Sequence, residues 1–120
     1  MKENIIKQKS FDFALRIVNL FRFLCEQKKE YVMSKQLLRS GTAIGALVRE
    51  SEHAESKSDF VHKMAIAQKE ANEADYWLEL LYKSDYLDEK MYSSIKSDIK
   101  EIRKILASII ISIKKRNKKS

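Results

Sequence analysis

The sequence FVHKMAIAQKEANEADYWLELL, residues 60–81, decides the fold of this protein. Its apolar side chains recur at alternating intervals of four and three residues, which places them on one face of an α-helix. That face consists of Phe60, Met64, Ala67, Ala71, Ala74, Leu78 and Leu81. We call this face the seam. Its spacing and its three central alanines are typical of a helix that packs closely against its neighbours in a bundle.

Three further segments show the same helical period, and the sequence contains no proline and two glycines to interrupt them. Because the connecting segments are short, consecutive helices are expected to pack antiparallel. We therefore predict an all-α, up-down-up-down four-helix bundle over residues 1–113, followed by a basic flexible tail at 114–120. The predicted helices span about residues 10–28, 34–54, 58–83 and 88–113.

Local signals mark where these helices begin. Ser10 and Ser34 are candidate N-caps, and Ser56 with Asp59 forms a capping-box pattern before the third helix. Asp88 or Asp85 is expected to cap the fourth helix.

Gly41 and Gly45 lie inside the second helix, where each glycine costs about 1 kcal/mol relative to alanine. A close backbone approach would offset that cost. We expect both glycines to face the alanines of the third helix.

The first and fourth predicted helices carry more apolar side chains than four packed helices need to bury. The first helix has one apolar row, Phe11, Ala14, Val18, Phe21 and Cys25, beside a second row, Phe13, Ile17, Leu20 and Leu24. In the fourth helix the surplus residues are Ile105, Ile110 and Ile111. We interpret this surplus as an interface between copies of the chain.

Composition favours a cytoplasmic protein without a membrane span. The apolar runs are far shorter than the ~20 residues that cross a bilayer, and the N-terminus lacks the apolar core of a secretory signal. The single cysteine, Cys25, cannot form an internal disulfide and lies on an apolar row, which favours a packing role.

The formal net charge of +7 points to a nucleic-acid partner, RNA or DNA. Five of the six positions from 114 to 119 are basic, and Lys100, Arg103 and Lys104 lead toward them. No recognition-helix or zinc-finger signature accompanies the charge, so sequence-specific binding is not indicated. The candidate nucleic-acid-binding residues are Arg39, Arg49, Lys57, Lys63, Lys114, Lys115, Arg116, Lys118 and Lys119. A solubilising tail is the alternative interpretation of these cations.

No enzymatic site, metal site or cofactor is predicted. Glu50–His53 and Asp59–His62 have the spacing of bundle metal ligands, but both pairs flank one connection instead of facing the bundle interior. Glu70 and Glu73 lie beside the seam next to Trp77. We expect these three residues in an ion-pair network or an oligomer interface, with Arg39, Arg49 or Lys63 as the partner cation.

The run SKQLLRSGTAIGALVRESEHAESKSDFVHKMAIAQKEANEADYWLELL, residues 34–81, resembles a bacterial family of four-helix bundles. This is the S23 family, whose members are associated with intervening sequences of 23S ribosomal RNA, and the resemblance covers roughly residues 10–113. The matching positions are Gln36, Arg39, Ser40, Ile44, Gly45, Arg49, Glu50, Ser58, Asp59, Phe60, Lys63, Glu70, Ala71, Glu73, Tyr76, Trp77 and Leu78. Leu47 and Ala43 depart from the family pattern, which usually has asparagine and serine there.

The resemblance implies a homo-oligomeric ring, with a homopentamer expected, and no enzymatic activity. The accessory variability protein of diversity-generating retroelements is similar in fold and implies nucleic-acid binding by analogy. We therefore predict a non-enzymatic, nucleic-acid-associated scaffold or accessory protein. The alternative is a protein-binding adaptor with no nucleic-acid role.

Overall fold

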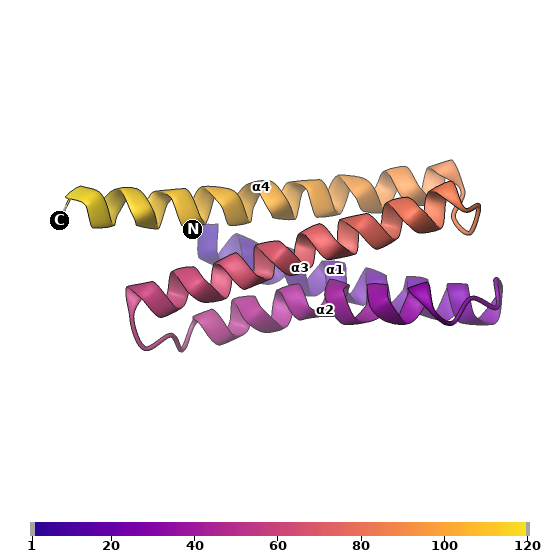
Figure 1. The fold of residues 1–120 in the computed structure, drawn as a ribbon, viewed down its shortest axis with the longest axis horizontal. Coiled ribbons are helices and arrows are strands. Elements are labelled where there is room, and N and C mark those ends of the chain that lie inside the picture. The colour runs from indigo at the N-terminus through magenta and orange to yellow at the C-terminus, as the bar shows by residue number, and fades with distance from the viewer. Residues whose placement is uncertain (1, 120) are drawn as a thin grey trace.

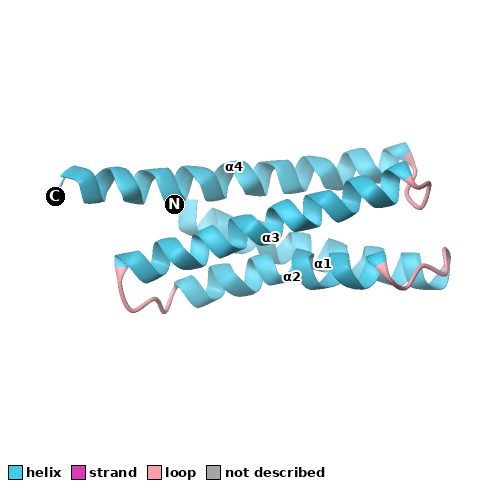
Figure 2. Cartoon of the chain, viewed as in Figure 1, coloured by secondary structure: helices cyan, strands magenta, loops and turns pink. Residues whose placement is uncertain are grey.

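The computed structural model is a rod of four helices with extents of 53 × 22 × 20 Å (Figure 1). It describes the backbone of residues 2–119 and the side chains of residues 2–116. Short loops join consecutive helices, and residues 2–119 contain no strand (Figure 2). The helices are α1 (Lys2–Glu26), α2 (Met33–Ser51), α3 (Lys57–Lys83) and α4 (Glu89–Lys119). The predicted all-α four-helix bundle is confirmed.

Contacts between the helices show that neighbours run antiparallel. Each helix packs on the next, and α4 returns to pack on α1, which closes a square. Near the start of α1, Lys7 pairs with Glu52 just beyond the end of α2, at 3.0 Å. Lys9 of α1 pairs with Glu101 near the middle of α4, at 2.8 Å, and Arg16, further along α1, pairs with the earlier Asp98 of α4, at 2.7 Å. Of the four contacts between helices, the one between α1 and α4 is the sparsest.

The seam of α3 forms the centre of the core, as its spacing predicts. Ala67, Ala71 and Ala74 are completely inaccessible to solvent, and Phe60 packs against the core with part of its ring exposed. Burial of each larger side chain stabilises the fold by about 1.5–3 kcal/mol. The largest fully buried side chains are Phe13, Ile6, Ile17, Leu24, Leu37, Ile44, Met64, Leu78, Leu81, Ile99, Ile102 and Leu106.

The glycines of α2 face α1, so the expectation that they face the alanines of α3 is wrong. A Cβ atom at Gly41 would lie 2.9 Å from Cγ1 of Ile17, and one at Gly45 would lie 3.3 Å from the backbone oxygen of Ser10. The small residues of α2 and α3 therefore serve different contacts. Gly41 and Gly45 let α2 approach α1, because any side chain there would meet occupied space.

We expect Gly41→Ala to destabilise the protein by about 1–3 kcal/mol, since overpacking outweighs the gain in helix propensity. In the double variant Ile17→Ala/Gly41→Ala, the γ carbons that meet the new methyl group are absent. Its loss of stability should therefore be smaller than the sum of the two single losses. Urea denaturation of the four proteins measures this coupling, and strict additivity would contradict the proposed contact.

The first helix begins eight residues earlier than predicted. Ser10 is fully buried inside α1, and its hydroxyl donates a hydrogen bond to the backbone oxygen of Lys7 at 3.2 Å, so it is not an N-cap. Ile6 is also fully buried and gives the additional N-terminal turns a share of the core. The signal was missed because polar residues at 7–10 separate Ile5 and Ile6 from the periodic rows.

The last helix continues to Lys119, so the predicted flexible tail after residue 113 is wrong. Residues 114–119 contain neither glycine nor proline, and lysine and arginine are good helix formers. Cations are also favourable near the C-terminus of a helix, where the backbone carbonyls carry partial negative charge. The remaining predicted helix ends differ from the observed ones by at most three residues.

The start of α2 is capped by Glu30, whereas Ser34 was the predicted cap. The Glu30 carboxylate accepts hydrogen bonds from the backbone N–H groups of Val32 and Met33, both at 3.1 Å. It also accepts one from Ser34 at 2.7 Å. Burial raises the pKa of Glu30, but the N–H groups of Ser34, Met33 and Val32 together lower that pKa below its ordinary value. A nearly buried carboxylate therefore stays charged at the end of the helix.

We expect Glu30→Gln to lower the free energy of unfolding by about 1–2 kcal/mol near neutral pH. Because the folded-state pKa of Glu30 is depressed, its charge stabilises the fold above the unfolded-state pKa. This contribution is lost as the pH falls through the folded-state value. Denaturation of both proteins across this range should show the difference shrinking below about pH 4. A difference independent of pH would refute the role of the charge.

The predicted cap of α3 is confirmed, and of the two candidates for the cap of α4, Asp88 and Asp85, the structure has Asp88. The Ser56 hydroxyl accepts a hydrogen bond from the Asp59 backbone N–H at 3.0 Å, and the Asp59 carboxylate accepts one from the Glu55 backbone N–H at 3.2 Å. The Asp88 carboxylate accepts one from the backbone N–H of Met91 at 2.8 Å.

Part of the apolar surplus is exposed in the single chain. Of the two rows in α1, the one that contains Phe13 and Ile17 is buried, and Phe11 of the other row is 42% exposed. Leu15, which belongs to neither predicted row, is 51% exposed. In α4, Ile110 is buried and Ile111 is 53% exposed. Within the described residues, no helix is both long and apolar enough to cross a membrane.

Candidate nucleic-acid interface

A polar groove lies between α3 and α4. Lys100, Arg103 and Lys104 line it from α4, and Gln68 and Asn72 line it from α3. These residues, together with one alanine of α4, surround an open groove of about 330 Å³. None of the six lining residues is a carboxylate. The groove therefore offers ammonium, guanidinium and amide groups to an anionic ligand.

Asp75 neutralises part of the charge beside this groove. Its carboxylate, 13% exposed, pairs with Lys96 at 2.5 Å and with Arg103 at 2.6 Å. One carboxylate thus meets two cations. Lys100 and Lys104 are exposed, and no ion pair among the side chains of residues 2–116 includes either of them. The groove keeps a positive charge that phosphate groups could reach.

The same helix carries further cations toward its C-terminus. Lys114, Lys115 and Arg116 are exposed on the last turns of α4. The side chains of Lys118 and Lys119 lie outside the described residues. Because α4 is helical here, Lys114, Lys115 and Arg116 extend the charge of the groove along the same helix.

Residues 2–108 match the family described as 23S rRNA-intervening sequence protein. The chain belongs to this family. The match spans all four helices, and the predicted resemblance is confirmed.

A solved structure supports the assignment of this family member. It is a protein with unknown function from the S23 ribosomal protein family of Bacteroides thetaiotaomicron VPI-5482. The two chains are 57% identical, and the alignment covers 92% of this chain and 98% of that chain with a TM-score of 0.90. No match was found among curated proteins.

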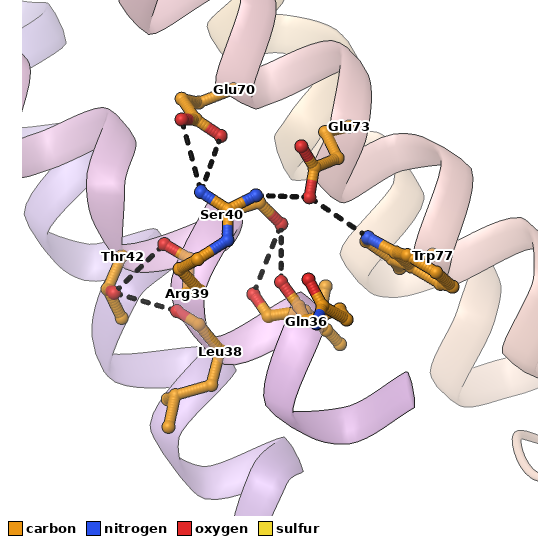
Figure 3. Close-up of polar contacts among 9 residues, drawn as sticks. Gln36, Leu38, Arg39, Ser40, Thr42, Glu70, Glu73 and Trp77 are labelled. Carbon is orange, nitrogen blue, oxygen red and sulfur yellow. Dashed lines mark hydrogen bonds and ion pairs between the residues drawn. The ribbon is translucent and has the colours of Figure 1, made fainter. Parts of the chain in front are cut away.

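In this family member, Arg39 joins α2 to α3 (Figure 3). Its guanidinium donates hydrogen bonds to the Glu70 carboxylate at 3.2 and 3.3 Å and to the Glu73 carboxylate. The indole N–H of Trp77 donates to Glu73 Oε2 at 3.2 Å. The bonds to Glu73 and Glu70 raise the pKa of Arg39, and those from Arg39 and Trp77 lower the pKa of Glu73.

This network shows the ion pairing of Glu70 and Glu73 and bears on the candidate role of Arg39 in nucleic-acid binding. The predicted ion pairing of Glu70 and Glu73 is present, with Arg39 as the cation. Because two carboxylates hold the guanidinium, Arg39 is not a favourable phosphate-binding residue. The place of Glu70, Glu73 and Trp77 in an oligomer interface stays a prediction.

The other candidates near the α2–α3 connection do not form one basic surface. The Arg49 guanidinium lies 4.9 Å from the ring centre of Phe11, on the α1 side of α2. Lys57 is exposed at the first position of α3. Lys63 lines a pocket whose other residues are Glu50, His53, Glu55 and Asp59. The acidic surroundings of Lys63 make this end of the bundle a poor phosphate site.

The chain has two histidines, His53 and His62, and one cysteine, Cys25. Within the described residues, no group of three or more His, Cys, Asp or Glu side chains could hold a metal ion. Cys25, expected in the core, is only partly buried, and its sulfur lies 3.9 Å from the Ser34 hydroxyl.

Gln68 and Asn72 are groove residues that the sequence analysis missed. Their signal is a spacing of four residues beside the alanine seam, which places two amides on the same flank of one helix. The sequence did not show which neighbouring helix that flank meets. In the structure it meets α4, so the two amides line a groove together with the cations of that helix.

Proposed function

We propose that this family member is a non-enzymatic, homo-oligomeric bundle that binds RNA or DNA through the groove between α3 and α4. The observation that carries the proposal is the pair Lys100 and Lys104, exposed beside two amides in a groove without a lining carboxylate. Contacts from lysine to phosphate give affinity without reading the sequence. A cytoplasmic setting is part of the proposal, since the single cysteine leaves no internal disulfide to form.

RNA is the first ligand to test, because the family description names 23S rRNA intervening sequences. The charge distribution supports a nucleic acid as the ligand in preference to a small anion. The net charge of +7 includes a row of cations along α4, from the groove to its C-terminal turns. A row of cations on one rod suits a polyanion better than a small anion.

The homo-oligomer is supported by the apolar face of α1. Phe11 and Leu15 are large, half-exposed side chains four residues apart, and Val18 continues the row with partial burial. A single exposed apolar residue is ordinary, but a row along one helix face is typical of an interface. We propose a second copy of the chain as the partner of this face, in a ring of five as the family resemblance implies.

We expect the double variant Lys100→Gln/Lys104→Gln to bind a labelled single-stranded RNA more than about tenfold more weakly at 100 mM salt. The slope of log K against log salt should become less steep by about 1.4, since two phosphate contacts to a single strand are removed. Fluorescence anisotropy at several salt concentrations measures both quantities.

The matched control is Lys35→Gln/Lys90→Gln, which removes the same charge from exposed positions of α2 and α4 outside the groove. It should retain most of the affinity and the salt slope. If both double variants lose affinity equally, net charge explains the binding and the groove is not the site.

We expect Leu15→Glu to reduce the native mass measured by light scattering from an oligomer toward the 14.1 kDa monomer. The helix should remain folded, because the side chain is half exposed in the single chain. Val32→Glu, at an exposed apolar residue of the α1–α2 connection, is the control and should leave the mass unchanged. A monomeric wild-type protein would eliminate the oligomer proposal.

One observation favours a protein-binding adaptor as the second candidate. The sparse contact between α1 and α4 leaves an open groove of about 280 Å³. Its apolar lining comes from Leu20 and Phe23 of α1, Leu87 before α4, and Met91 and Ile95 of α4. The adaptor would replace the nucleic-acid proposal if RNA and DNA fail to bind at low salt and a protein partner is lost on Met91→Glu.

A further inference from the structure

An exposed aromatic ring, Tyr76, lies one helical turn beyond the α3 side of the polar groove. Gln68, Asn72 and Tyr76 are spaced by four residues, so they follow one another along α3, each turned about 40° further around the helix axis. Tyr76 is 57% exposed, although tyrosine is a large and mostly apolar side chain. Nothing in the core requires this ring, since the buried seam of α3 runs through Ala71, Ala74 and Leu78.

The ring of Tyr76 packs against one aromatic residue of the network that joins α2 to α3. It meets the ring of Trp77 edge to face, with centres 5.0 Å apart and planes at 72°. Trp77 donates its indole N–H to Glu73, and Glu73 binds Arg39 (Figure 3). Glu73 thus holds the indole of Trp77, and the ring of Tyr76 packs against that indole. An immobilised ring loses little further entropy when a flat ligand stacks on it.

From these two features we infer that the site takes single-stranded nucleic acid, with phosphates at Lys100 and Lys104 and a base stacked on Tyr76. The inference rests on the proposed function and specifies its ligand. Base stacking on aromatic side chains is typical of single-strand binding, because a base in a duplex has its faces covered by neighbouring bases. Gln68 and Asn72, between the cations and the ring, can exchange hydrogen bonds with sugar or base edges.

The test compares two labelled oligonucleotides with the same number of phosphates, a single-stranded DNA and its fully abasic counterpart. We expect Tyr76→Ala to weaken binding of the base-containing strand by about five- to a hundredfold and to leave the abasic strand unaffected. Tyr76→Phe should restore the affinity, because the aromatic ring and not the hydroxyl stacks on the base. Tyr31→Ala, at a tyrosine of similar exposure in the α1–α2 connection, is the matched control.

Trp77 gives a second measurement, since it is the single tryptophan of the chain and touches Tyr76. Binding of the base-containing strand should change its fluorescence emission, and the abasic strand should change it much less. An RNA strand of the same length should give the same pattern. A duplex of equal charge should bind the wild-type protein more weakly than the single strand and be insensitive to Tyr76→Ala.

The outcomes separate this inference from the proposed function. If Lys100→Gln/Lys104→Gln abolishes binding but Tyr76→Ala leaves the base-containing strand unaffected, the stacking inference is wrong and the groove remains a phosphate site. Equal affinity of the base-containing and abasic strands would overturn it in the same way. If neither strand binds at low salt, both the inference and the proposed function fail.

Discussion

The close contact between α2 and α1 at Gly41 is the constraint on which the arrangement of the other side chains depends. A side chain at this position would collide with Ile17, which is fully buried in the core. The two helices can therefore approach only with glycine there, and this approach fixes which side of α2 faces α1. The opposite flank of α2 then meets α3, where Arg39 reaches Glu70 and Glu73.

The two flanks of α3 differ in how their charges are satisfied. On the α2 side, one guanidinium is shared by two carboxylates. On the α4 side, one carboxylate, Asp75, is shared by Lys96 and Arg103, and Lys100 and Lys104 add charge beyond them. The first flank therefore has an excess of negative charge and the second an excess of positive charge, so the exposed cations of the protein are concentrated along α4. Arg39 is therefore held by carboxylates, whereas Lys100 is accessible to a phosphate group.

The exposed apolar residues follow from the uneven packing around the square. The contact between α1 and α4 is the sparsest of the four, and α1 buries one of its two apolar rows within the chain. Phe11 and Leu15 remain on the outside of the bundle, and Phe11 receives the Arg49 guanidinium on its ring. Such a face is stabilised further if another molecule covers it, because more apolar area then leaves water.

The sequence by itself determined the class of fold, the seam of α3, the cap Ser56, and the position of Glu70 and Glu73 together beside that seam. These features depend on spacings of three and four residues, which one helix or one connection fixes locally. The tertiary structure decided which helix Gly41 faces, that Glu30 caps α2, and that Gln68, Asn72 and Lys100 share a groove. The spacing of residues along a helix gives their angle around its axis, but the rotation of each helix against its neighbours follows from packing across the whole bundle.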